Sequence, residues 1–333
     1  MRVAINGFGR SGRTVFRILQ GRPGIEVVGI NDATDVETMA YLLRRDSVRG
    51  LFPGRAEIVD GALVTDRGAA RLTAIGNPAD LPWKELGVDF VVESTGLFRK
   101  RDEVACHVTA GARKVILTVA PKDRVDATIV IGVNDDALRP EHLVVSGASG
   151  ATNCLAPLVS VLDTAFGLEH GLMTTTRAYT GDQSLVDAPH GDLRRARAAA
   201  LNIVPTATGA ARAVGDVLPH LKGRLDGMVL RVPVSAGSVV DLVSVMKKDV
   251  TVAAVNEALR MASESTRLAG ILGYAVDPLV STDVVGDSRS CLFDPGCTTV
   301  IAGRMLKTIS WYDNEWGCSS RVCDLLELLG RTD

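Results

Sequence analysis

The sequence predicts an α/β protein of two domains: a doubly wound parallel sheet, then an α+β domain with a mainly antiparallel sheet. Short apolar strands alternate with helical segments through the first half, as in a parallel sheet with helices on both faces. The second half has longer strands of alternating hydrophobicity, typical of an antiparallel sheet with one covered face. The length of 333 residues is sufficient for two domains.

The first half contains the apolar runs expected of buried strands. We predict strands at residues 3–5, 25–30, 89–93, 114–117, 128–131 and 143–145. Helical segments separate them, and we predict helices at residues 13–19, 36–44 and 103–109. This alternation predicts a first domain over residues 1–149.

The second half has a different pattern of elements. We predict strands at residues 227–234 and 239–245, and helices at residues 157–165, 208–217 and 252–263. A Gly/Ser/Asn-rich stretch at residues 146–153 marks the border between the halves. We expect a second domain over residues 150–315, and a terminal segment 316–333 whose helix, at 318–329, returns to the first domain.

Composition excludes several classes of function. The formal net charge of −2 argues against nucleic-acid or membrane-surface partners, and no apolar run approaches the ~20 residues of a membrane span. The six cysteines lack paired CxxC spacing and the five histidines lack metal-ligand spacing. The chain enters a strand pattern at its first residues, so we expect a cytoplasmic protein with reduced thiols.

A glycine-rich turn after the first strand has the pattern GxGxxG. Its residues are Gly7, Gly9 and Gly12, with Arg10 and Ser11 between the last two. Asp32 follows about 20 residues later, at the end of the second strand. Such glycines permit a tight turn and close approach of a pyrophosphate, which then faces the helix N-terminus. The context predicts a Rossmann-type site for NAD rather than NADP, because Asp32 would repel a 2′-phosphate.

Further motifs extend along nearly the whole chain. They are INGFGRSGR at residues 5–13, ND at 31–32, RDSV at 45–48, ESTG at 93–96, AP at 120–121, AS at 148–149, TNCLAP at 152–157, TATGAA at 206–211, RVP at 231–233 and SWYDNEWG at 310–317. Together they resemble the glyceraldehyde-3-phosphate dehydrogenase family, although Ser11 stands where an aliphatic residue is usual. The resemblance implies that Thr95, Gly96 and Asn314 also bind NAD. It also implies a homotetramer, with the loop around residues 179–201 at a subunit interface beside the cofactor.

The resemblance further implies a covalent mechanism, from which this chain departs. In the family, a cysteine attacks the aldehyde, a histidine takes the proton as hydride leaves for the nicotinamide, and phosphate cleaves the thioester. The family motif ASCTTNC reads ASGATNC here, so Gly150 occupies the nucleophile position, and Arg177 occupies that of the histidine. An arginine cannot act as a general base, because its pKa stays above about 12. We therefore expect that this chain cannot follow the thioester route.

Residues that match the family's anion sites are retained. Those matching the substrate-phosphate site are Thr180, Asp182 and Arg231; those matching the inorganic-phosphate site are Ser149, Thr208, Gly209 and either Arg195 or Arg194. Hydroxyl, amide and guanidinium donors suit phosphate oxygens. These residues predict a small phosphorylated or anionic substrate.

The sequence offers no convincing replacement for the lost base. Cys154 is ordinary in the family motif, which favours a structural thiol, and His190 belongs to a loop pattern that some family members share. Cys318 replaces the tyrosine of the family's Trp-Gly-Tyr and is expected near the cofactor, either in catalysis or as a space-filling residue. By resemblance, Arg177 points at the reacting carbon. There its charge would favour bound NADH over NAD⁺ or hold an anion above Gly150, unless it turns away into solvent or an ion pair.

Three explanations remain open at this point. The chain is a paralogue with altered chemistry, a catalytically inactive NAD-binding sensor or assembly partner, or an engineered inactive variant. The retained phosphate and dinucleotide residues favour the first. Differences at Gly150, Ala151, Arg177 and Cys318 weaken the third, because trapping a complex requires only one change.

Overall fold

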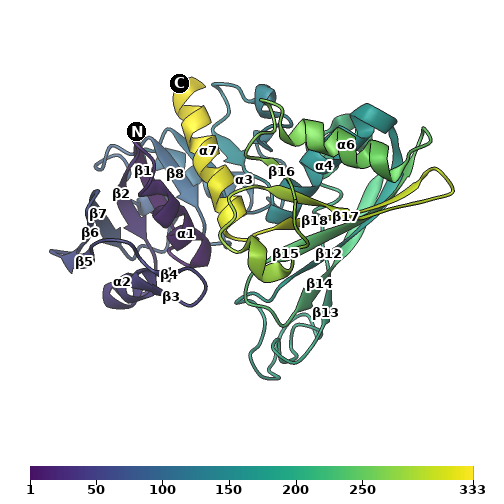
Figure 1. Cartoon of the computed structure of the whole chain (residues 1–333). Coiled ribbons are helices and arrows are strands. Elements are labelled where there is room, and N and C mark those ends of the chain that lie inside the picture. The colour runs from purple at the N-terminus through teal and green to yellow at the C-terminus, as the bar shows by residue number, and fades with distance from the viewer. Residues whose placement is uncertain (333) are drawn as a thin grey trace. The chain divides into compact units, whose positions relative to one another are not determined.

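The computed structural model describes residues 1–332, which divide into two compact units (Figure 1). The first unit comprises Met1–Ile129, Asp135–Ala148 and the C-terminal segment from Ser319. The second comprises Val130–Asn134 and Ser149–Cys318. Each unit has its own sheet.

A nine-stranded sheet organises the first unit in the order β10-β11-β9-β8-β1-β2-β7-β6-β5. Neighbours from β10 to β7 are parallel, and β7, β6 and β5 are antiparallel. The strands are β1 (Arg2–Asn6), β2 (Glu26–Asn31), β5 (Ala56–Val59), β6 (Ala62–Thr65), β7 (Gly68–Thr73), β8 (Phe90–Glu93), β9 (Lys114–Leu117), β10 (Ala127–Thr128) and β11 (Val144–Ser146). A separate pair consists of β3 (Arg45–Asp46) and β4 (Gly50–Leu51).

The helices of this unit are α1 (Arg10–Leu19), α2 (Val36–Arg44), α3 (Arg101–Thr109) and most of α7 (Trp316–Thr332). The interior residues of β1, β8 and β9 are buried on both faces, which explains why these strands read as continuous apolar runs. The α1 helix buries Val15, Phe16 and Leu19 and packs on β1 and β2.

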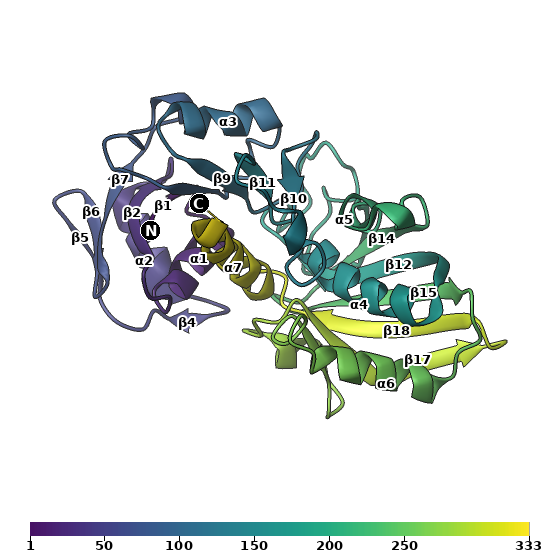
Figure 2. The same cartoon turned by 90° about the horizontal axis from the view of Figure 1, so that it is seen from above.

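A seven-stranded sheet organises the second unit in the order β13-β14-β12-β15-β18-β17-β16. Its pairs are antiparallel except β12 with β14 and β16 with β17. The strands are β12 (Leu168–Ala178), β13 (Val204–Ala207), β14 (Leu225–Val232), β15 (Ser238–Met246), β16 (Leu272–Tyr274), β17 (Cys291–Ile301) and β18 (Met305–Tyr312). Figure 2 shows α4 (Gly150–Phe166) and α6 (Val252–Ser263) beside this sheet, where α4 packs on β15, β17 and β18 and α6 packs on β17.

The predicted α/β class is confirmed, but several predicted elements are wrong in extent. The helix predicted at residues 157–165 begins at Gly150, because the Ser149 hydroxyl caps it and Pro157 lies inside it. The helix predicted at 208–217 is reduced to α5 (Val214–Val217). Its first residues form turns, one of them closed by the Thr208 hydroxyl, which accepts a hydrogen bond from the Ala210 amide. The strand predicted at 128–131 is only β10, and β5 to β7 were not predicted.

Short 3₁₀ helices complete the secondary structure at Pro78–Asp80, Asp135–Ala137, Pro219–Leu221 and Ser281–Val284. Within residues 1–332, no helix has both the length and the apolar character to cross a membrane. The cysteines in this part of the chain form no disulfide with one another.

Candidate active site

The turn between β1 and α1 is built around glycines that have no room for a side chain. Gly7 has a φ of 91°, and a Cβ there would lie 2.6 Å from the Thr95 amide nitrogen. A Cβ on Gly12 would overlap the carbonyl oxygen of Gly7. Gly9 precedes α1 as its N-cap without a side-chain cap, and the space around its Cβ position is open for 4 Å. The first turn of α1 therefore keeps amides available to a phosphate.

Asp32 lies at this turn as an ionised carboxylate. Its Oδ2 accepts a hydrogen bond from the Phe8 amide at 2.6 Å, and its Oδ1 accepts one from the Thr34 amide at 2.9 Å. Burial opposes ionisation, but the hydrogen bonds from Thr34 and Phe8 outweigh it and lower the pKa of Asp32. Arg10 and Ser11 form the start of α1 in the same turn.

A buried carboxylate holds Thr95 and Gly96 beside the turn. The amide and the hydroxyl of Thr95 both donate to Glu93 Oε1, the amide at 2.9 Å. Glu93 Oε2 accepts from Asn6 Nδ2 at 2.6 Å and lies 3.0 Å from His107 Nε2. Gly96 follows with a φ of 71°. This turn fits a dinucleotide. It has no room for side chains at Gly7 and Gly12, open space at Gly9 and a carboxylate at Asp32.

In the second unit, Gly150 begins α4 and leaves an unfilled position beside Tyr312. A Cβ on Gly150 would lie 3.4 Å from Tyr312 Cε2, 3.5 Å from the Asn314 carbonyl oxygen and 3.8 Å from Cys318 Cβ. These are ordinary contact distances, and the backbone at Gly150 is helical. The position would therefore accept a cysteine, and Cys318 is its immediate neighbour.

Arg177 belongs to a row of side chains that crosses the sheet. It is in register with Arg231 on β14 and with Ser238 on β15, and Ser238 is in register with Tyr312 on β18. Register partners project from the same face of a sheet, and the Tyr312 hydroxyl lies 3.0 Å from that of Thr175, two residues before Arg177. Arg177 Nε is buried without a hydrogen-bond partner. Within residues 1–332, no acid forms an ion pair with Arg177.

Tyr312 was not singled out by the sequence, although it lies within the quoted SWYDNEWG motif. Burial raises the pKa of its phenol, against the opposing effects of Arg177 and of hydrogen bonds with Thr175 and Ser238. The phenol therefore stays protonated at neutral pH and does not replace the missing base. Asn314 lies close by, with its Oδ1 accepting a hydrogen bond from the Ser238 hydroxyl at 3.2 Å.

The predicted substrate-phosphate residues do come together. Arg231 Nη1 donates to Thr180 Oγ1 at 2.5 Å, Asp182 Oδ1 at 2.7 Å and Gln183 Oε1 at 3.1 Å. Asp182 Oδ2 also accepts from Arg195 Nη1 at 3.0 Å. Although burial opposes it, these hydrogen bonds and charges hold the pKa of Asp182 well below its usual range. The sequence missed Gln183, which only its adjacency to Asp182 could have indicated.

The predicted inorganic-phosphate residues meet at the start of α4. The Ser149 hydroxyl lies 2.7 Å from that of Thr152, which donates to the Ala210 carbonyl oxygen at 3.2 Å. This contact joins the first turn of α4 to the turn that carries Thr208 and Gly209.

The two arginine alternatives have different surroundings in the structure. Arg195 pairs with Asp182 and, through Nε at 3.1 Å, with Asp192. Arg194 is exposed, and only its backbone amide is bonded to Asp192. Arg195 therefore lies with the predicted substrate-phosphate residue Asp182 rather than with Ser149 and Thr208, and the Arg194 side chain is exposed.

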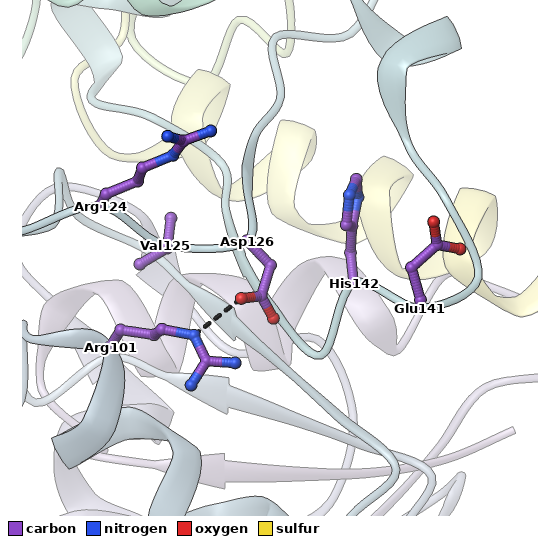
Figure 3. A pocket seen from close by; sticks show the side chains of 6 residues that line it. All are labelled: Arg101, Arg124, Val125, Asp126, Glu141 and His142. Atoms are coloured by element: carbon purple, nitrogen blue, oxygen red, sulfur yellow. Dashed lines mark hydrogen bonds and ion pairs between the residues drawn. The ribbon is translucent and has the colours of Figure 1, made fainter.

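A separate cavity of about 440 Å³ opens in the first unit (Figure 3). It is lined by Arg101, Arg124, Val125, Asp126, Glu141 and His142. Arg101 and Asp126 pair across it at 2.7 Å. None of the predicted site residues lines this cavity, so we do not assign it to the site.

Comparison with known proteins identifies both units. Residues 1–101 match the model of the glyceraldehyde 3-phosphate dehydrogenase NAD binding domain, and residues 149–314 match that of the C-terminal domain. Glyceraldehyde-3-phosphate dehydrogenase of Borreliella burgdorferi is 53% identical over 335 residues, covering 99% of each chain. That of Thermotoga maritima is 53% identical over 330 residues and 98% of each chain. That of Mycobacterium avium is 52% identical over 340 residues, covering 100% of this chain and 99% of its own. The chain belongs to the glyceraldehyde-3-phosphate dehydrogenase family.

Membership of the glyceraldehyde-3-phosphate dehydrogenase family defines the general chemistry of this chain. Its N-terminal part is an NAD-binding domain, so its cofactor is NAD, and the family is one of oxidoreductases. The C-terminal match spans both Gly150 and Arg177, so the two departures lie inside a domain that is otherwise typical of the family.

Proposed function

We propose that this chain is a paralogue of glyceraldehyde-3-phosphate dehydrogenase that converts a small phosphorylated or anionic molecule without forming a thioester. The observation that carries the proposal is the unpaired guanidinium of Arg177, which stands in register with the phosphate-site residue Arg231. A partly buried cation without a paired acid costs desolvation free energy. If the site had only lost its activity, nothing would favour retaining such a cation at residue 177.

The thioester route lacks both of its groups. Gly150 supplies no nucleophile, Arg177 cannot take a proton, and the buried phenol of Tyr312 stays protonated. Bound NAD supplies a hydride acceptor or donor. The residues of this chain bind the anionic ends of the substrate and hold them in place.

The charge of Arg177 also bears on the cofactor. Family resemblance puts this position beside the nicotinamide, which is cationic when oxidised and neutral when reduced. A guanidinium there favours NADH over NAD⁺. Replacing Arg177 with His should therefore shift the ratio of the two dissociation constants towards NAD⁺. An unchanged ratio would show that this charge argument is wrong.

An inactive NAD-binding assembly protein is the second candidate. Five apolar side chains between residues 185 and 203 are 65–83% exposed: Leu185, Val186, Leu193, Leu201 and Ile203. They lie in and next to the loop that, in the family, forms a subunit interface, and a homotetramer would cover them. Such an assembly accounts for the exposed residues but not for Arg177.

A turnover screen separates the two candidates. The protein would be incubated with NAD⁺ or NADH and with phosphorylated aldehydes, ketones, alcohols and acids, with NADH absorbance and product mass as the readouts. Conversion of one of them supports the paralogue. If NAD binds and no phosphorylated metabolite changes, the inactive assembly protein is the better account.

A reversion variant serves as the control for the screen. Gly150→Cys with Arg177→His should regain oxidation of glyceraldehyde 3-phosphate if the rest of the scaffold is intact. Cys318→Tyr would be added, because the Cys318 Cβ lies 3.8 Å from the new side chain and its thiol could trap it.

A further inference from the structure

The row of residues across the second sheet places two arginines at neighbouring positions on adjacent strands. Arg231 and Arg177 are register partners on the parallel strands β14 and β12, whose backbones lie about 4.8 Å apart. Both side chains project from one face, and the Nε atom of each is buried without a hydrogen-bond partner. Two cations at this spacing repel each other unless anions lie between or beside them.

The chain compensates one of these cations and not the other. Asp182 pairs with Arg231 at 2.7 Å and with Arg195 at 3.0 Å, and Asp192 also pairs with Arg195. The two acids therefore balance two of the three arginines. Arg177 instead acts electrostatically on the buried phenol of Tyr312, which is neutral, and within residues 1–332 no acid pairs with it. One positive charge of the cluster is left for a ligand.

Tyr312 is a neighbour of both Arg177 and the Gly150 position. Gly150 carries no side chain, and the groups nearest its Cβ position belong to Tyr312, Asn314 and Cys318. The start of α4 lies there, where first-turn amides have no acceptor within the helix and favour negative charge. A guanidinium binds a carboxylate through two parallel hydrogen bonds, and a carboxylate is smaller than a phosphate.

We propose that the substrate is a phosphorylated carboxylic acid whose phosphate is held at Arg231 and whose carboxylate is held by Arg177 at the Gly150 position. This inference rests on the proposed function and narrows it to one substrate class. Adjacent strands lie about 4.8 Å apart, so the two arginine side chains are spaced to bind the opposite ends of a three-carbon acid that carries a phosphate.

Calorimetric titration without added NAD tests this at constant salt. The probes are 3-phosphoglycerate, glycerol 3-phosphate, which has a hydroxymethyl group in place of the carboxylate, and 1,3-propanediol bisphosphate. We expect 3-phosphoglycerate to bind about 10- to 100-fold more tightly than glycerol 3-phosphate. Equal affinities for 3-phosphoglycerate and glycerol 3-phosphate would overturn the proposal. If 1,3-propanediol bisphosphate bound most tightly, the group held by Arg177 would be a second phosphate and not a carboxylate.

Variants assign the selectivity to Arg177. Arg177→Gln should bring the affinity ratio of the first two probes close to 1 and leave glycerol 3-phosphate binding unchanged. Arg177→Lys keeps the charge and should keep part of the ratio, even if the Gln variant folds poorly. Arg194→Gln is the matched control, because Arg194 is an exposed arginine of the same unit. A ratio that survives Arg177→Gln contradicts the proposal.

The binding readout is independent of turnover. Selective binding of 3-phosphoglycerate with no conversion in the screen would sustain this inference and remove the proposed enzymatic function. Conversion of a phosphorylated compound that has no carboxylate, with equal binding of 3-phosphoglycerate and glycerol 3-phosphate, would sustain the proposed enzymatic function and remove this inference.

Discussion

Glu93 in the first unit and Arg177 in the second are charged side chains near the ends of strands, but their surroundings differ. The Glu93 side chain is fully buried and accepts hydrogen bonds from Asn6 and twice from Thr95, while His107 lies 3.0 Å away. Arg177 has a buried Nε without a hydrogen-bond partner, and no acid among residues 1–332 pairs with it. A charge whose hydrogen bonds are completed by the chain maintains structure, and we propose that the incomplete one at Arg177 is kept for a ligand.

The protonation of the Glu93 cluster follows from its partners. Trp83 Nε1 lies 2.9 Å from His107 Nδ1, and an indole nitrogen can only donate. Nδ1 therefore accepts, and the proton of a neutral imidazole lies on Nε2, which donates to Glu93. The cluster thus anchors Thr95, whose amide lies against Gly7 in the nucleotide turn.

The largest effect should come from removing Glu93. Glu93→Ala leaves several buried donors without an acceptor, and we expect the free energy of unfolding to fall by about 3–5 kcal/mol. Urea unfolding followed by circular dichroism measures this. Glu26→Ala is the control, because the Arg2–Glu26 pair is about half exposed and should contribute less than about 1 kcal/mol. Similar losses of unfolding free energy in Glu93→Ala and Glu26→Ala would show that Glu93 is not a special structural charge, and its contrast with Arg177 would no longer hold.

Filling the empty position beside Arg177 should have the next largest effect. In Gly150→Cys, the new Cβ would lie 3.8 Å from that of Cys318, the mean separation in a disulfide. Under oxidising conditions we expect a crosslink that stabilises the protein by up to about 2–4 kcal/mol. Mass spectrometry would detect the loss of two hydrogens, which Cys318→Ser should prevent. A fully reduced variant would show that the two positions are further apart.

Removing Arg177 should behave in the opposite way to removing Glu93. Arg177→Met leaves no buried carboxylate without its counter-ion, because no acid among residues 1–332 is paired with Arg177. We expect unfolding free energy to change by less than about 1 kcal/mol or to rise. A loss as large as that of Glu93→Ala, measured in the same way, would mean that Arg177 is structural.

The smallest effect concerns the acid that balances Arg231. The pKa of Asp182 is lowered in the folded state, so its stabilisation is complete above its unfolded pKa of about 3.9 and is lost as pH falls towards the folded value. Because Asp182 is 43% exposed, we expect Asp182→Asn to cost only about 0.5 kcal/mol at pH 7. The difference from the unchanged protein should shrink below about pH 4. A difference independent of pH would contradict this assignment.

Local patterns account for what the sequence predicted well. The α2 and α6 helices and the β9 strand have the predicted bounds, because each has a complete apolar period within its own residues. The α4 helix was predicted to begin seven residues too late, since Pro157 resembles a helix start when the Ser149 cap is overlooked. The helix predicted over 208–217 failed because hydroxyl-closed turns compete with helix at Thr208.

The sequence by itself determined the nucleotide turn, the family and the departures from its motifs at Gly150 and Arg177, because each is a matter of residue identity at short spacing. Tertiary structure decided which charges are balanced. Arg177 and Arg231 are neighbours only through the register of β12 with β14, and Asp182 reaches Arg231 only once that pairing forms. Strand pairing over such separations depends on the packing of the whole sheet, so no local pattern could show that Arg177 is left without an acid.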